Sequence, residues 1–214
     1  MDEKLRLRCE IGTRARPVVR QAGEVMRMHL SRPPLQQSYL VFLGLWAGET
    51  PAGRNDAETR GRLRGFRHEG IDFFVDLTED GEVEPYAHLL HPWARHVGVP
   101  MRAGELPPRR RVREAIATVD RALGDGFFVY VHGAEGVERT GIVLGCWLAF
   151  WSHHGGDPVA MLEELRGGVP GRRRRTPATA AGRAFVRSWR PYGYRSTVAG
   201  SALRVVSPAE GGSR

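Results

Sequence analysis

Residues 127–151 read FFVYVHGAEGVERTGIVLGCWLAFW, in which an apolar strand runs into a glycine-bearing loop, an arginine and then a helix. The backbone N–H groups of such a loop converge at the positive end of the helix, where they suit a phosphate-sized dianion. Arg139, at the end of the loop, can bind two phosphate oxygens through its planar guanidinium. The same layout also fits an ordinary strand–loop–helix connection with a surface arginine, so spacing alone leaves both interpretations open.

The loop sequence VHGAEGVERTG resembles the signature loop of the protein tyrosine and dual-specificity phosphatases, which reads His-Cys, five residues, Arg, Ser or Thr, and Gly. The segments AGETP, FFVDLTEDGEVEPYAHLL, HVGVPMR and RTPATAAGRAFVRSW are similar to successive segments of small bacterial members of that family, so the resemblance covers about residues 35–190. It implies the α/β fold of the dual-specificity phosphatases. It also implies a reaction in which a cysteine thiolate attacks phosphorus, an aspartate protonates the leaving group, and water hydrolyses the phosphocysteine.

The resemblance places the phosphate-binding residues in and beside this loop. Arg139 matches the arginine that clamps the phosphate, Thr140 matches the hydroxyl residue after it, and His132 matches the histidine before the nucleophile. Gly136 keeps a glycine of the loop. The expected phosphate-binding set is therefore His132, Gly133, Ala134, Glu135, Gly136, Val137, Glu138, Arg139 and Thr140.

Three catalytic positions depart from the family pattern. Gly133 stands at the position of the nucleophilic cysteine, Ala103 at that of the acid, and Gly182 at that of the glutamine that orients water. Glu105 lies two residues after Ala103 and is a candidate substitute for the acid. Only a thiolate is a competent nucleophile in this chemistry, and Cys146 is expected to face the core about two turns into the following helix. No residue is therefore expected to be catalytically functional.

Glu138 is a further departure, because the bacterial relatives commonly have glycine there. A carboxylate about 4–6 Å from a bound dianion would oppose binding by a few kcal/mol. Two alternatives stay open at this point. The side chain turns outward, or it pairs with Arg139 and fills the empty pocket as an internal phosphate mimic.

These features predict a pseudophosphatase that keeps a phosphate-binding loop and binds a phosphorylated protein or another anionic ligand. One alternative is an active tyrosine or dual-specificity phosphatase using Glu105 and an unidentified nucleophile, or an artificially inactivated version of such an enzyme. A second alternative is a basic nucleic-acid-associated protein, because the formal net charge is +8. Nucleic acid is not the expected partner, since no aromatic interleaving or helix-turn-helix pattern accompanies the charge.

Charge is uneven along the chain. Residues 1–34 contain eight basic and four acidic side chains, which is typical of a solvated tail or of an arm for an acidic surface. The runs Arg109–Arg111 and Arg172–Arg175 lie near the expected mouth of the site. They are interpreted either as a basic rim or as an ordinary arginine-rich surface.

Composition favours a soluble globular protein, with hydrophobic residues at 41% and charged residues at 26% of the 214 residues. No apolar run approaches the ~20 residues of a membrane span, and the first residues lack the apolar stretch of a signal peptide. Cys9 and Cys146 are the two cysteines, which favours a reducing cytoplasm over a disulfide framework. No metal or cofactor is expected, because the histidines at 88, 91, 96, 153 and 154 lack a ligand spacing. The sequence does not predict the oligomeric state.

The expected organisation is a basic extension over residues 1–34, a phosphatase-like domain over 35–190 and a tail over 191–214. The extension has at most one helix, over residues 18–30. Strands are expected within 38–48, 71–76, 94–101 and 127–132, and helices within 56–69, 110–123, 140–152, 157–166 and 176–189. Asp56, Asp157 and Thr176 are the expected N-caps, with Pro158 and Pro177 in the first turns of the last two helices. This alternation predicts a central, mostly parallel sheet covered by helices on both faces.

Overall fold

The computed structural model describes residues 33–151, 156–169 and 175–190. Several sequence-based expectations lie outside these ranges. They are the helix over 18–30, the tail after 190, the histidines at 153 and 154, and most of the Arg172–Arg175 run. No helix within the described ranges has the length and hydropathy needed to cross a bilayer.

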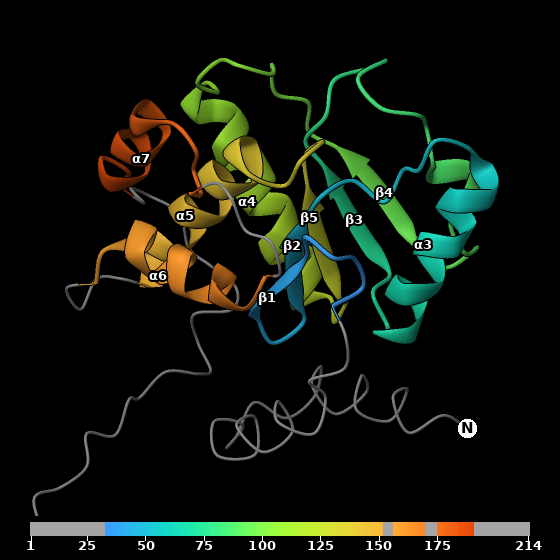
Figure 1. Cartoon of the computed structure of the whole chain (residues 1–214). Helices are drawn as coiled ribbons and strands as arrows, with labels where there is room; N and C mark the ends of the chain where they lie inside the picture. Colours follow the sequence, from blue (N-terminus) through green and yellow to red (C-terminus); the bar gives the residue numbers. More distant parts are fainter. Residues whose placement is uncertain (1–32, 152–155, 170–174, 191–214) are drawn as a thin grey trace, which may run out of the picture.

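Five short strands form one sheet in the order β1-β2-β5-β3-β4 (Figure 1). Their bounds are β1 Tyr39–Phe42, β2 Leu45–Gly48, β3 Phe73–Asp76, β4 Arg95–Gly98 and β5 Val129–His132. Only β1 pairs antiparallel, with β2, and the other neighbours are parallel. His132, the last residue of β5, is in register with Gly48 of β2 and with Asp76 of β3. The loops that follow these three strands therefore leave the sheet side by side.

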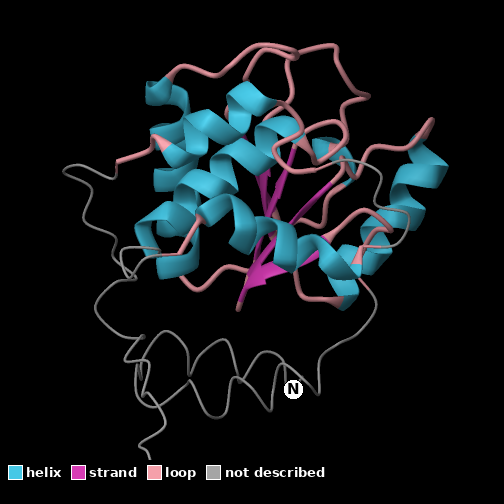
Figure 2. Cartoon of the chain, turned by 60° about the vertical axis from the view of Figure 1, so that its left-hand side comes forward, coloured by secondary structure: helices cyan, strands magenta, loops and turns pink. Residues whose placement is uncertain are grey.

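Helices cover both faces of the sheet, as the alternating pattern predicts. One face carries α3 (Asp56–His68) and the 3-10 turn η1 (Ala87–Leu89), and the other carries α4 (Arg109–Gly124), α5 (Glu138–Trp151), α6 (Pro158–Leu165) and α7 (Ala180–Arg187). The 3-10 turn η3 (Arg166–Gly168) extends α6. Figure 2 shows the larger group of helices stacked in front of the strands.

Alternate strand residues supply two apolar cores, one on each face. Trp46, Phe74 and Tyr130 pack with Phe66 of α3 in the smaller core. Ala47, Val75 and Val131 belong to the larger core with the buried faces of α4, α5, α6 and α7. Helix α5 is the most enclosed, with Ile142, Val143 and Leu144 fully buried, so the loop before it rests on a fixed support.

Two expected N-caps are wrong. The side chain of Asn55, not Asp56, caps α3 by accepting a hydrogen bond from the N–H of Glu58 at 2.9 Å. Helix α7 begins at Ala180 rather than near Pro177, because the Thr179 side chain accepts from the N–H of Gly182 at 2.9 Å. Thr176 is engaged elsewhere, since its hydroxyl donates to the carbonyl of Val137 at 2.6 Å.

The expected start of α6 is confirmed, with Asp157 as N-cap and Pro158 in the first turn. Helix α5 begins at Glu138, two residues before the expected Thr140. In the first arginine run, Arg109 donates to the backbone and side-chain oxygens of Ser188 and lies over the ring of Trp189. This arginine therefore helps to dock α7 against α4.

Candidate phosphate-binding site

The loop between β5 and α5 is packed against the end of β2. Gly136 has φ +67°, and a Cβ atom there would lie 2.1 Å from the carbonyl carbon of Gly48, so only glycine fits. The carbonyl of Ala134 accepts a hydrogen bond from the N–H of Thr50 at 3.1 Å. These contacts fix the loop from outside and leave its inner side available.

Several backbone N–H groups of the loop are free to bind an anion. Those of Ala134, Gly136, Val137 and Glu138 donate no hydrogen bond within the part of the chain that the structure describes. The last of them opens α5, whose N-terminal end carries a partial positive charge. Free N–H groups beside a helix N-terminus are the elements of a phosphate cradle.

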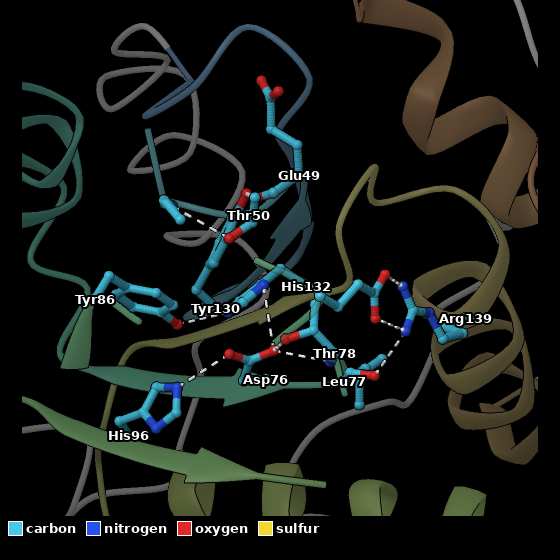
Figure 3. Close-up of polar contacts among 12 residues, drawn as sticks. Glu49, Thr50, Asp76, Leu77, Thr78, Tyr86, His96, Tyr130, His132 and Arg139 are labelled. Carbon is cyan, nitrogen blue, oxygen red and sulfur yellow. Dashed lines mark hydrogen bonds and ion pairs between the residues drawn. The ribbon is translucent and has the colours of Figure 1, made fainter. Parts of the chain in front are cut away.

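Arg139 is held firmly by the loops that follow β3 and β4. Its Nη1 donates to the carboxylate of Glu82 at 2.6 Å and to the carbonyls of Met101 at 2.9 Å and Leu77 at 3.2 Å. Its Nη2 donates to the second carboxylate oxygen of Glu82. The dashed lines in Figure 3 show this arrangement around Arg139 and Leu77. The hydrogen bonds from Arg139 keep the pKa of Glu82 below its usual value.

The opposite edge of the same guanidinium faces the loop. A Cβ atom built on Gly133 would lie 3.5 Å from Nε of Arg139 and 3.7 Å from its Nη2. Glu82 and the two carbonyls take the N–H groups on the Nη1 side, so the Nε–H and one Nη2–H remain on the edge nearest Gly133. That pair of donors matches two oxygens of a phosphate group.

Nothing in the backbone requires a glycine at position 133. Gly133 is absent from the positive-φ glycines among the described residues, and the nearest described atoms to a built Cβ are at ordinary contact distance, 3.5 Å. One of those atoms is Oγ1 of Thr140, which is buried and has no hydrogen-bond partner among the described residues. An unpaired buried hydroxyl therefore points toward the space that a side chain at position 133 would fill.

The acid-loop residues are not arranged for proton transfer. The side chain of Glu105 is 62% exposed and lies 3.5 Å from Arg102, so no contact holds it over the loop at 133–137 within the described ranges. The N–H of Ala103 donates to the carboxylate of Glu79 at 3.1 Å. Glu79 and Glu82 thus connect the loop after β3 to the acid loop and to Arg139. No motif in the sequence predicts a role for either residue.

Glu138 turns away from the cradle. Its carboxylate accepts hydrogen bonds from the N–H of Thr179 at 2.9 Å and from the Thr179 hydroxyl at 2.6 Å. The alternative in which it pairs with Arg139 is wrong, because Glu82 occupies that place. A Cβ atom on Gly182 would lie only 2.4 Å from Oε1 of Glu138. The carboxylate of Glu138 therefore fills the space that a side chain at position 182 would need.

Comparison with known proteins identifies the family. Residues 48–153 match the profile of a family described as "Polymorphic toxin system, DSP-PTPase phosphatase". The domain belongs to the tyrosine and dual-specificity phosphatase family. A putative tyrosine phosphatase of Invertebrate iridescent virus 3 is 34% identical over 86 residues, which are 37% of this chain and 35% of the viral protein. The chain thus spans about a third of the length of that relative.

Solved structures confirm the phosphatase fold. The human tyrosine phosphatase-like serine/threonine/tyrosine-interacting protein superimposes with a TM-score of 0.53 at 16% identity, covering 71% of this chain and 94% of the human protein. P. aeruginosa TpbA, solved in complex with phosphotyrosine, gives a TM-score of 0.55 at 19% identity, covering 74% of this chain and 87% of that protein.

The two departures at Glu138 and Gly182 of this phosphatase-family domain should be energetically coupled. Gly182→Gln alone forces the Glu138 carboxylate off Thr179 and should destabilise the fold by about 1–3 kcal/mol. Glu138→Gly alone loses two exposed hydrogen bonds, about 1 kcal/mol. In the double variant the Glu138 carboxylate no longer opposes the glutamine, although its Cβ still lies 2.9 Å from Cβ of Pro177. Urea unfolding should therefore show the double variant less destabilised than the sum of the single variants by about 1 kcal/mol. Strict additivity would contradict this account.

A buried polar network supports the start of the phosphatase loop. Nε2 of His132 lies 2.6 Å from the hydroxyl of Tyr86, and Asp76 accepts hydrogen bonds from the N–H and hydroxyl of Thr78 at 2.8 and 2.6 Å (Figure 3). Burial lowers the pKa of His132 to about 4, despite the nearby charge of Asp76. Burial favours neutral Asp76, but hydrogen bonds from His96 and Thr78 and the charge of His132 outweigh it and lower its pKa to about 2.

His132 should make the fold sensitive to mild acid. Its pKa is 6.5 when unperturbed and about 4 in the folded state, so the folded state resists protonation and loses stability as the pH falls from about 6.5 to 4. The loss should be about 3 kcal/mol by urea unfolding, at 1.36 kcal/mol per pKa unit. His132→Gln should flatten this interval, whereas His88→Gln, with its exposed ring, should not. If the free energy of unfolding of the wild type did not change over this pH interval, the assignment of a lowered pKa to His132 would be refuted.

Proposed function

We propose that this chain is a catalytically inactive member of the phosphatase family that binds the phosphate group of a phosphorylated protein or of another anionic ligand. The observation that carries the proposal is the orientation of Arg139. Glu82 and two carbonyls hold one edge of the guanidinium, and the other edge faces the free N–H groups of the loop. This pre-organised set of donors supports phosphate binding without any rearrangement of the loop.

The side chains at the expected catalytic positions support inactivity. Gly133, Ala103 and Gly182 offer no nucleophile, no acid and no amide to orient water. Cys146 cannot replace the nucleophile, since it is buried in the core and burial raises the pKa of its thiol. Thr140 is buried too, and without a base its hydroxyl is a poor nucleophile.

The names of the relatives agree with a binding role. The human neighbour is called phosphatase-like and interacting, and the P. aeruginosa neighbour was solved with phosphotyrosine. We infer that phosphotyrosine or a similar phosphomonoester is the group recognised here. The family description points to a polymorphic toxin system as the context in which such a domain acts. Cys146 is buried and forms no disulfide within the described residues, which supports a cytoplasmic location.

One observation favours a second candidate function, in which the chain is an otherwise active phosphatase that lacks only its nucleophile. Position 133 accepts a side chain without a clash, and the Thr140 hydroxyl that would face it has no partner in the described part of the chain. Such a site would regain chemistry from a single cysteine, whereas a fully remodelled site would not.

Turnover of p-nitrophenyl phosphate separates the proposed binder from an enzyme. The wild-type chain should release p-nitrophenol no faster than the Arg139→Lys variant, because covalent catalysis has no nucleophile. Release well above that control, and lost on Arg139→Lys, would show that the loop is catalytic. Glu105→Gln would then test whether Glu105 supplies the acid.

A further inference from the structure

A hollow lies at the opposite end of β3 from the phosphate loop. It encloses about 440 Å³ between α3 and residues 89–94. Ile71 and Asp72, which precede β3, form part of its wall, whereas the phosphate loop lies beyond Asp76 at the other end of that strand. The volume falls in the range of small-molecule sites, about 300–1,000 Å³. We call this hollow the α3 groove.

The α3 groove combines an apolar floor with an exposed aromatic ring. Leu63, Leu89 and Leu90, all partly exposed, contribute to its lining, whereas the lining residues Phe66 and Phe74 are only 1% exposed. Trp93 at its edge is 61% exposed and is one of two exposed large apolar side chains in the described ranges. The guanidinium of Arg67 lies 5.9 Å from the centroid of the Trp93 ring. The ring of His91 already lies against the indole, with centroids 3.1 Å apart. A planar ligand ring can therefore stack only on the part of the Trp93 ring that His91 leaves exposed.

Three arginines of one helix line the same groove. Arg60, Arg64 and Arg67 are three and four residues apart, so they share one face of α3. Arg60 and Arg64 form no ion pair with any described residue. Arg54 and Arg62, just outside the groove, both pair with Glu58. The unpaired arginines repel one another at this spacing, and an anion between them would relieve that repulsion.

Asp72 restricts where an anion can sit, and His91 adds no positive charge to the groove. The buried carboxylate of Asp72 accepts a hydrogen bond from the N–H of Phe128 at 2.9 Å and belongs to the groove wall near the start of β3. Burial and the charge of Arg67 lower the pKa of His91, so its ring is neutral at neutral pH. A negative charge is therefore excluded from the Asp72 end and is favoured along Arg60 and Arg64.

We propose that the α3 groove binds an aromatic anion of the size of a mononucleotide. The ring stacks on Trp93 and covers the apolar floor, and the phosphate is held by Arg60 and Arg64, one turn apart on α3. The guanidinium groups supply charge-assisted hydrogen bonds in the geometry that phosphate oxygens accept. This site is independent of the phosphate loop, and its ligand differs in requiring the ring as well as the charge.

Titration with adenosine 5′-monophosphate tests the proposal through tryptophan fluorescence and calorimetry. The wild-type chain should bind one equivalent with quenching of fluorescence. Arg60→Gln/Arg64→Gln should weaken binding by about tenfold or more, and Trp93→Leu should abolish the quenching. Arg110→Gln/Arg121→Gln removes the same charge from exposed positions of α4 and should change the affinity less than about twofold.

The remaining outcomes each decide for or against the α3 groove. Binding that survives Arg139→Lys but not Arg60→Gln/Arg64→Gln supports it. If Arg139→Lys abolishes nucleotide binding and Arg60→Gln/Arg64→Gln does not, the nucleotide binds at the phosphate loop and the proposal is wrong. The proposal is overturned by equal weakening in both double variants, which would indicate nonspecific charge attraction, or by an absence of saturable binding at millimolar nucleotide. It is also overturned if a glutamate-rich peptide binds through Arg60 and Arg64 while the nucleotide does not.

Discussion

A Gly133→Cys variant is expected to become phosphorylated on the new thiol and to lose the phosphate slowly. The added Cβ meets no described atom closer than 3.5 Å, so the loop needs no rearrangement. Its thiolate would lie beside the free edge of Arg139, the unpaired hydroxyl of Thr140 and the N-terminal end of α5. Such surroundings lower a thiol pKa from about 8.5 by two units or more.

The reaction of the Gly133→Cys variant should proceed quickly to the phosphocysteine and only slowly beyond it. With p-nitrophenyl phosphate, whose leaving group needs no acid, we expect a burst of about one equivalent of p-nitrophenol followed by slow turnover. Gly182 cannot orient the water for hydrolysis of the phosphocysteine. Adding Ala103→Asp should speed phosphotyrosine cleavage by about 100-fold or more and leave the p-nitrophenol burst nearly unchanged.

Gly133→Ser is the matched control for the burst, because it fills the same space without a thiolate and should give none. Alkylation by iodoacetamide across a pH series reports the thiol pKa directly. The buried Cys146 should stay unreactive in every variant. A new thiol with an ordinary pKa, or no burst, would mean that the Arg139 edge and the Thr140 hydroxyl do not face position 133 as described.

Glu82→Gln is expected to weaken phosphate binding by about ten- to a hundredfold and to destabilise the fold by about 2 kcal/mol. The Arg139 side chain is only 9% exposed, so removal of its partner charge leaves a poorly compensated cation. The two carbonyls that remain, and the partial exposure of Glu82, moderate the loss. The glutamine amide also presents a donor to the guanidinium, which turns the free edge away from the loop.

Urea unfolding and phosphate titration measure both effects. Glu84→Gln, an exposed change two residues further along the same loop, should leave stability and affinity nearly unchanged. The sign of the affinity change is decisive. If Glu82 competed with the ligand for Arg139 instead of orienting it, Glu82→Gln would raise the affinity for phosphate.

The elements that position the site could be predicted from local sequence. Residues 127–139 show a buried strand, a glycine at a close approach and a helix start, and each of these depends on neighbours along the chain. The exact caps could not be predicted, because Asn55 and Asp56, or Thr176 and Thr179, are equally good capping types. Tertiary contacts determine which of the two residues caps the helix. The Thr176 hydroxyl, for example, donates to the carbonyl of Val137 and does not cap α7.

The hydrogen-bond partners of the site residues could not be predicted from neighbouring residues in the sequence. Glu82 lies 57 residues before Arg139 and is brought to it because β3 and β5 are parallel neighbours in register. The acidic run TEDGE after a buried strand was the available signal, since loops after adjacent parallel strands leave the sheet together. In the sequence, Glu138 and Gly182 are two separate departures from the family pattern. Their shared volume becomes evident only when α5 and α7 are placed side by side.

Phosphorus NMR titration of inorganic phosphate into the wild-type chain and the Arg139→Lys variant tests the central claim most directly. Inorganic phosphate lacks the ring that the α3 groove requires, so its binding reports on the loop. The account predicts saturable binding to the wild type at about millimolar concentration or tighter, and at least about tenfold weaker binding to Arg139→Lys, with both proteins folded. Equal affinities, or no binding to the wild type, would contradict it.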